Sequence, residues 1–346
     1  MTKLVVSTAG PATSVQDAGR FGAQRYGLTP SGAMDRGSLA VANTLAGNAP
    51  FAAAIEIGPL GAAFTARGGP VRVALAGAAR NADIAGTPLP MNQTALVADG
   101  ETLRLGPARD GVFSYLAIEG GLKGEPVFGS LSVNARAGLG SPYPRPLQAD
   151  DALAVATAQP APHERALEIP DRPKSPIRVV TGPQDDEFGD AVKLFLDSEW
   201  RISATSDRMG YRLEGPKIMH EGGHNIVSDG TVTGSIQVPG SGQPIVLMAD
   251  RGTSGGYPKI ATVISADLGR FAQTQAGTTV RFQAVSVADA QAEARAMASF
   301  LGALAGRIHP AGASSLNLAE LHQANVAGAA VNATDTATWH PHAGEP

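Results

Sequence analysis

The chain has 346 residues, 43% of them hydrophobic, and its formal net charge of −4 gives no reason to expect nucleic acid or an anionic membrane as a partner. It contains no cysteine, which excludes disulfides, thiolate nucleophiles and cysteine-based metal sites and fits a reducing cytoplasm. The length favours two domains, and 42 glycines with 25 prolines favour strands and turns over long helices.

The N-terminus, residues 1 to 6, reads directly as a strand and lacks the apolar core of a secretory signal. No apolar run approaches the roughly 20 residues that a membrane-spanning helix needs. We therefore expect a soluble, cytoplasmic protein.

In the first half of the chain, residues 34 to 46 predict a helix, because apolar residues share one face and Gly47 follows as a helix end. Alternating apolar residues then predict short strands at 71–75, 102–105 and 115–118. A proline-rich connector at 158–176 separates the two halves.

The second half begins with a predicted strand at 177–180 and a helix at 184–197, followed by strands at 245–248 and 261–264 and a helix at 287–305. Many short strands at close spacing favour β-barrels. We predict a mainly β protein with an N-terminal domain at 1–160, a C-terminal domain at 174–308 and a low-complexity, mobile tail at 309–346.

Residues 220 to 224 satisfy the zinc-protease pattern H-E-x-x-H, with His220 and His224 as the two histidines. That chemistry requires both histidines on one face of a helix. Two adjacent glycines inside the motif cost about 2 kcal/mol of helix propensity relative to alanine. We interpret the segment as a surface loop and predict no metal site.

Residues 252 to 256 match G-x-S-x-G, the nucleophile elbow of hydrolases, around Ser254. An elbow requires a strand before the serine and a helix after it. The chain after Ser254 continues as a strand, so a catalytic serine is not expected. No P-loop and no Met-Lys-Met occurs, so any biotin would be carried on another chain.

Several stretches combine glycines with clustered polar residues, which is typical of binding loops on a rigid scaffold. They lie at 14–20, 30–35, 206–213, 234–239 and 247–259. Taken singly, each has a structural explanation as a surface ion pair or a hairpin end.

The order of these stretches resembles the allophanate hydrolase subunit 2-like group, a biotin-dependent carboxyltransferase family. The group includes the C subunit of prokaryotic 5-oxoprolinase, an antagonist of a sporulation kinase inhibitor, and part of urea carboxylase. The resemblance runs from about residue 4 to 290. One departure is residues 129–133, where relatives usually carry Gly-Ser-Arg-Ser-Thr and this chain has Leu131 in place of arginine.

The resemblance implies two cyclophilin-like β-barrel domains, a B-like partner subunit of the same family and, in 5-oxoprolinase, a third, A-like subunit. The complex would open the lactam 5-oxo-L-proline to L-glutamate at the expense of ATP. A lactam is a poor electrophile, so its carbonyl oxygen would need activation, by phosphorylation, before water attacks.

Five charged residues are candidates for the catalytic groups, with the cations neutralising developing charge and the carboxylates positioning groups or accepting a proton. They are Asp17, Arg20, Asp250, Arg251 and Lys259. The candidate substrate-binding residues are Gln16, Asp35, Arg208, Gln237, Thr253, Gly255, Gly256 and Tyr257.

Two other functions stay open. One is carboxyl transfer from a carboxybiotin on another protein to urea or another small amide, with Gln237 and glycine backbone amides holding the ureido ring. The other is a non-catalytic regulatory protein whose polar loops form a protein interface.

Overall fold

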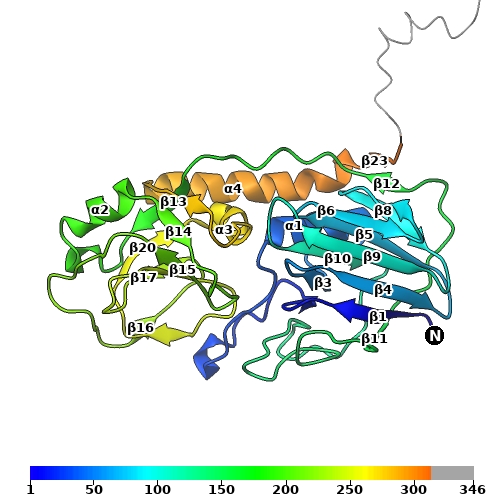
Figure 1. Cartoon of the computed structure of the whole chain (residues 1–346), viewed down its shortest axis with the longest axis horizontal. Coiled ribbons are helices and arrows are strands. Elements are labelled where there is room, and N and C mark those ends of the chain that lie inside the picture. Colours follow the sequence, from blue (N-terminus) through cyan, green and yellow to red (C-terminus); the bar gives the residue numbers. More distant parts are fainter. Residues whose placement is uncertain (313–346) are drawn as a thin grey trace, which may run out of the picture.

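Strands dominate the N-terminal half, where two sheets enclose one hydrophobic core; the computed structural model describes residues 1–312 (Figure 1). The first sheet has the strand order β11-β1-β4-β9-β6-β7. Its strands are β1 (Lys3–Ala9), β4 (Ala62–Arg67), β6 (Arg80–Ile84), β7 (Thr87–Pro88), β9 (Thr102–Ala108) and β11 (Ala152–Ala154).

The second sheet of this half has the order β2-β3-β10-β5-β8-β12-β23. Its strands are β2 (Ser14–Gln16), β3 (Ala54–Ile57), β5 (Val71–Gly77), β8 (Gln93–Val97), β10 (Ser114–Ile118), β12 (Arg165–Ala166) and β23 (His309–Pro310). The last of these comes from the end of the described chain, which returns to the N-terminal half.

Both faces of this second sheet are buried, as the alternation along β5 and β10 shows. Val73 and Leu116 point into the core between the two sheets, whereas Ala74 and Tyr115 belong to a second core on the opposite face. Successive side chains of a strand point to opposite faces, so each strand contributes to both cores. The second core continues into the C-terminal half.

The C-terminal half is built on an eight-stranded sheet of order β21-β14-β15-β18-β17-β20-β13-β22. Its strands are β13 (Ile177–Thr181), β14 (Trp200–Ile202), β15 (Gly210–Glu214), β17 (Ser235–Gln237), β18 (Ile245–Leu247), β20 (Lys259–Val263), β21 (Thr279–Val280) and β22 (Phe282–Ala284). The two edge strands, β21 and β22, are separated by Arg281 alone, so the sheet curls into a nearly closed barrel. A small ribbon pairs β16 (Asp229–Gly230) with β19 (Ser254–Gly255).

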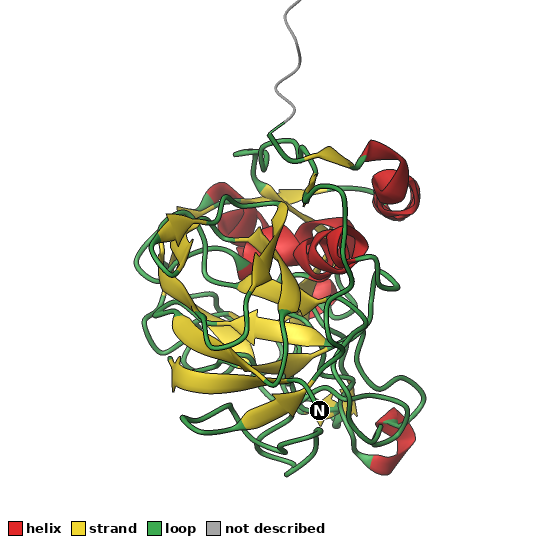
Figure 2. Cartoon of the chain, turned by 90° about the vertical axis from the view of Figure 1, so that its right-hand side faces the viewer, coloured by secondary structure: helices red, strands yellow, loops and turns green. Residues whose placement is uncertain are grey.

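Most of the helical segments gather on one side of the molecule, as Figure 2 shows from the end of the N-terminal half. They are α1 (Arg36–Ala46), α2 (Ala191–Asp197), α3 (Ser265–Ala272), α4 (Val287–Ala303) and the 3-10 turns η1 (Gln24–Tyr26), η2 (Asp185–Glu187) and η3 (Leu304–Arg307). Helix α1 packs on β5 and β10, and α4 extends from the C-terminal half to contact α1 (Figure 1).

The predicted mainly β fold with few helices is confirmed, and each strand predicted from alternation is present. The helices predicted at 34–46 and 287–305 are present as α1 and α4. The helix predicted at 184–197 is wrong, because Gly189, with φ +47°, interrupts it between η2 and α2. Helix α3 was not predicted.

The connector predicted at 158–176 contains the short strand β12, which pairs with β8 and with β23. His309 and Pro310 therefore belong to a sheet, and the predicted tail does not begin at 309. The rest of that tail, from residue 313, lies outside the described residues. Among residues 1–312, no helix combines the length and apolar character that crossing a membrane requires.

Candidate functional site

Asp17 ties the loop after β2 to a second loop, at 129–133. Its Oδ1 accepts hydrogen bonds from the backbone of Gly19 at 2.8 Å and from the Ser130 hydroxyl at 2.7 Å. The Ser132 hydroxyl also donates to Oδ1, and the Leu131 backbone N–H donates to Oδ2 at 2.7 Å. A carboxylate with four donors is well suited to fix two loops against each other.

Arg20 lies against the same loop and is only 1% exposed. Its Nη2 donates to the backbone carbonyl of Ser132, while Nε and Nη1 have no partner among the described residues. Burial lowers the pKa of Arg20, and the nearby carboxylates of Asp17 and Asp250 act in the opposite direction. A buried guanidinium with unused donors is suited to hold an anion or an ordered water.

Gln16 is fully buried beside this loop, where its amide nitrogen donates to Ser14 Oγ at 2.9 Å and to the Val133 carbonyl at 3.1 Å. Its Oε1 has no partner among the described residues. Gln16 therefore supports the loop, with one acceptor unused.

Arg208 connects the two halves through a buried ion-pair network. It binds Asp250, with Nε to Oδ2 at 2.8 Å, and it also pairs with Glu56 of the N-terminal half. A third bond runs from Nη2 to the carbonyl of Gly32 at 2.7 Å. Burial lowers the pKa of Arg208, but the charges of Glu56 and Asp250 outweigh it and raise the pKa above its ordinary value.

Arg251 makes a second connection between the halves and is 3% exposed. Its Nη1 donates to Thr29 Oγ1 at 2.9 Å, and its Nη2 donates to the Thr231 carbonyl at 3.1 Å. The same carbonyl accepts a hydrogen bond from Gln24 Nε2 at 3.2 Å. Burial lowers the pKa of Arg251, and its Nε has no partner among the described residues.

Lys259, 2% exposed, is held by a carboxylate that the sequence did not single out. Its Nζ lies 2.8 Å from Oδ2 of Asp229, whose side chain is half exposed. Gln184 joins them, since its Oε1 accepts from the Lys259 backbone at 3.1 Å and its Nε2 donates to Asp229 at 3.3 Å. The hydrogen bond from Lys259 holds the pKa of Asp229 below its ordinary value.

Gln237 is the residue opposite Lys259 in the pairing of β17 with β20. Its amide nitrogen lies against Gly255, where a Cβ would be 2.4 Å from Nε2. Glycine is therefore required at 255 for this arrangement of the Gln237 side chain.

The other predicted binding residues have varied environments. The backbone carbonyl of Thr253 accepts a hydrogen bond from the 229–231 segment, and that of Gly256 accepts one from residue 226. Tyr257 is 40% exposed. Asp35 is the N-cap of α1, and its carboxylate also accepts from Gln273 Nε2 at 2.9 Å. Asp35 thus lies in the joint between the halves, and its backbone N–H donates to the Tyr115 hydroxyl, which in turn donates to Glu56 of the Arg208 network.

The segment after Arg20 contacts the 249–253 loop of the C-terminal half. Gln24 Nε2 is 3.5 Å from the Thr253 carbonyl, and Thr29 Oγ1 donates to the Ala249 carbonyl at 3.1 Å. The group around Arg251 lies at this seam, and Asp250 acts across it on the group around Arg20. The group around Lys259 lies on the C-terminal side, where Asp229 belongs to the same short segment as the Thr231 carbonyl that Arg251 binds. We call these groups the seam site.

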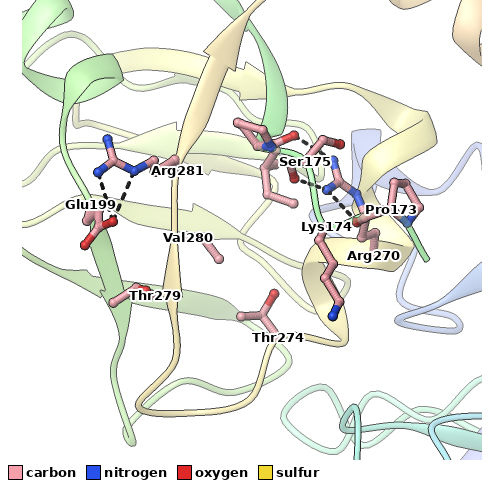
Figure 3. Close-up of a pocket in the computed structure, with 11 residues that line it drawn as sticks. Pro173, Lys174, Ser175, Glu199, Arg270, Thr274, Thr279, Val280 and Arg281 are labelled. Atoms are coloured by element: carbon pink, nitrogen blue, oxygen red, sulfur yellow. Dashed lines mark hydrogen bonds and ion pairs between the residues drawn. The ribbon is translucent and has the colours of Figure 1, made fainter. Parts of the chain in front are cut away.

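Two cavities lie outside the centre of the seam site. One, of about 420 Å³, is walled by the end of the connector, Arg270 and Arg281, and contains none of the predicted site residues (Figure 3). Arg270 there holds the connector through backbone carbonyls, and Arg281 pairs with Glu199 at 2.9 Å. The other, of about 510 Å³, includes Tyr257 and Pro239 at its edge.

Several residues that contact the predicted cations were not identified from the sequence, among them Gln184, Asp229, Thr231 and Thr29 in the seam site and Glu56 beside Arg208. Asp229 precedes a glycine, and the sequence alone indicates a turn at such a dipeptide. Its relation to Lys259, 30 residues away, follows only from the pairing of β16 with β19.

Two sheets in one half, a barrel in the other and buried cations and amides near their joint define a β-rich protein with a polar candidate site. The family model "Carboxyltransferase domain, subdomain A and B" matches residues 26–284, and the chain belongs to this family.

Among curated proteins, the chain is 37% identical over 319 residues to the C subunit of 5-oxoprolinase from Escherichia coli, covering 88% of this chain and 99% of that protein. It is 36% identical over 278 residues to the corresponding C subunit from Haemophilus influenzae, covering 80% and 89%. The resemblance noted in the sequence is therefore confirmed.

Solved structures of longer chains contain the same fold. The crystal structure of Kluyveromyces lactis urea carboxylase matches with a TM-score of 0.78 at 27% identity, over 89% of this chain and 30% of that one. A second solved structure matches with a TM-score of 0.73 at 36% identity and is covered over 56% of its length. In these structures further polypeptide accompanies the fold.

Proposed function

We propose that this chain is the C subunit of a cytoplasmic, ATP-dependent 5-oxoprolinase that opens 5-oxo-L-proline to L-glutamate together with a B-like and an A-like subunit. The observation that carries the proposal is the 37% identity to the E. coli C subunit over 99% of that protein. Nearly the whole length of that relative therefore has an aligned counterpart in this chain.

The seam site supplies chemistry suited to a lactam. A preorganised ammonium such as Lys259, fixed by Asp229 and Gln184, stabilises negative charge that develops on a carbonyl oxygen. The Gln237 amide, carried by the residue opposite Lys259 in the sheet, is a group that can hydrogen-bond the ring amide. ATP, bound by the complex, supplies the activation of that oxygen.

The unused donors of Arg20 and Arg251 fit an anionic group, either the substrate carboxylate or a phosphate. Both guanidinium groups are buried in the isolated chain. Contact with an anionic group of the substrate would therefore need small shifts at the seam. Asp17 and Asp250 lie close enough to Arg20 to favour its charge, and Asp250 also binds Arg208. We assign the two carboxylates to positioning cations ahead of proton transfer.

Carboxyl transfer is the second candidate function, because the matching family model is named for a carboxyltransferase domain and the K. lactis urea carboxylase contains the same fold. The fit of the residues does not differ between the two reactions, since an ammonium and an amide suit a ureido ring equally. Biotin would then be carried on another chain.

The test is to co-purify the chain with a B-like subunit from the same genome, add the A-like subunit, and measure ATP-dependent loss of 5-oxoproline. Turnover by the three together is expected. Absence of turnover, with carboxylation of urea by the same complex in the presence of carboxybiotin, would replace this proposal with the second function.

Within that complex, Lys259→Met should lower kcat at least about 100-fold, because it removes one charge-stabilising donor of the seam site. The melting temperature should change little, since the half-exposed Asp229 carboxylate remains hydrated. Lys193→Met, at an exposed position of α2, is the matched control and should retain full activity. A fully active Lys259→Met complex would show that the seam site is misplaced.

A further inference from the structure

Exposed aromatic side chains are concentrated beside the seam site. Four aromatic residues among residues 1–312 have large exposed fractions: Phe21 at 65%, Tyr26 at 62%, Phe128 at 54% and Tyr257 at 40%. The first three lie in two neighbouring loops, where Tyr26 and Phe128 have ring centroids 6.4 Å apart. Clustered exposed aromatic residues are costly in water and mark binding surfaces.

Two arginines complete this surface. The Arg25 guanidinium lies 4.8 Å from the centre of the Tyr26 ring, and that of Arg36 lies 5.5 Å from the Phe21 ring. Neither forms an ion pair within the described residues, and Arg36 donates instead to the Ala18 carbonyl. We call Phe21, Arg25, Tyr26, Arg36 and Phe128 the aromatic loop patch.

The patch is anchored by the seam site itself. Asp17 and Arg20 bind the 130–132 segment at the base of both loops, so the hydrogen bonds that fix these residues also orient the aromatic tips. Gln24, between Phe21 and Tyr26, reaches the Thr231 carbonyl of the C-terminal half. In Figure 1 the short dark-blue turn η1 lies at the lower centre, between the two halves.

We propose that the aromatic loop patch is the docking surface for the B-like partner, whose matching face presents an apolar hollow bordered by carboxylates. This inference rests on the proposed function and adds the location and chemistry of the interface. Aromatic residues and arginine are the types enriched at the centres of protein interfaces, where a few of them carry most of the binding energy.

A separate polypeptide is a better occupant than a second copy of this chain. Relatives are named as one subunit of an enzyme, and in K. lactis urea carboxylase this fold makes up 30% of a longer chain. The patch is also cationic, so two copies facing each other through it would bring four arginines together. An acidic rim on a different polypeptide neutralises that charge.

The test compares a triple variant, Phe21→Ser/Tyr26→Ser/Phe128→Ser, with a control, Leu60→Ser/Leu194→Ser/Val287→Ser, whose residues are 64%, 42% and 58% exposed elsewhere on the surface. Binding of each to the purified B-like subunit is measured by calorimetry. The patch variant should bind at least about 100-fold more weakly, while the control binds like the wild type. Circular dichroism should show both variants folded.

Charge is tested separately with Arg25→Glu, which should weaken binding at low salt by about tenfold and reduce the dependence of Kd on salt. Wild-type affinity in the triple variant would overturn the proposal, as would failure of the wild-type chain to bind the partner. A wild-type dimer that the triple variant abolishes would assign the patch to self-association instead.

These results separate the two proposals. A wild-type complex that assembles through the patch but does not consume 5-oxoproline leaves the docking surface in place and removes the function. Turnover by a triple-variant complex with unchanged Kd preserves the function and removes the docking surface.

Discussion

At the scale of single residues, a buried charge holds helix α3 against strand β13 in the C-terminal half. Asp267, 2% exposed in α3, accepts two hydrogen bonds from the Arg178 side chain, one of them at 2.7 Å, and another from the Arg178 backbone. Arg270 donates to the same carboxylate at 2.7 Å. Burial raises the pKa of Asp267, but these hydrogen bonds outweigh it and lower the pKa below its ordinary value.

Asp267→Asn should lower the free energy of unfolding at pH 7 by about 3 kcal/mol, because it removes the buried carboxylate shared by the partly buried Arg178 and Arg270, of which Arg178 keeps its pair with Glu293. A pKa lowered on folding stabilises the protein above the unfolded value of about 4, and that contribution disappears as pH falls through the folded value. Urea unfolding at pH 7 and pH 3 should therefore show a smaller difference between variant and wild type at pH 3. The control is Asp171→Asn at an exposed position; an equal deficit at both pH values would contradict the linkage.

At the scale of elements, the β16–β19 ribbon positions the seam site. It brings Asp229 to Lys259 and presses the backbone of Gly255 against the Gln237 amide. Glycines along one ribbon therefore have different roles: a Cβ at Gly255 would meet Gln237, whereas a Cβ at Gly230 would have no heavy atom within 4 Å. Gly255 and Gly230 are therefore a matched pair of positions for substitution.

Gly255→Ala should reduce turnover of the complex at least about tenfold, because the Gln237 side chain must move from its place against residue 255. Its stability should change by less than about 1 kcal/mol, since the displaced group is the end of a flexible side chain. Gly230→Ala, in the facing strand, should keep wild-type kinetics. Equal kcat and KM for the two variants would show that Gln237 does not contact substrate.

At the scale of the whole molecule, the two halves share one core. Leu39, Tyr115 and Leu304 of the N-terminal side lie in the same buried cluster as Val179 and Phe271 of the barrel. Gln273 reinforces the joint, with Oε1 accepting the backbone N–H groups of Val112 and Phe113 at 2.8 and 2.9 Å.

Residues 1–312 should therefore unfold in one calorimetric transition, with a van't Hoff enthalpy close to the calorimetric enthalpy. A fragment of residues 174–308 should show no sharp transition, because the barrel face that packs on α1 would be exposed to water. Two separated transitions in the longer chain would show that the predicted domains are independent.

The sequence by itself determined the mainly β fold, most of the strand positions and two of the main helices. These follow from local properties: alternation on strands such as 71–75, and Asp35 and Gly47 at the ends of α1. It failed at α3, a short helix with a buried aspartate on its apolar side, and at 184–197, where one glycine stops a helix that the apolar spacing favours.

The tertiary structure alone decided which polar residues act together. The sequence selected Lys259, Arg251 and Arg208 as chemically suitable, but their partners Asp229, Thr29 and Glu56 lie 30, 222 and 152 residues away along the chain. The structure also showed that Arg251 and Lys259 are buried and that Asp35 belongs to the joint between the halves. The local sequence pattern indicates which residues of a segment face water and which are buried. A site depends in addition on which distant segments the shared core holds together.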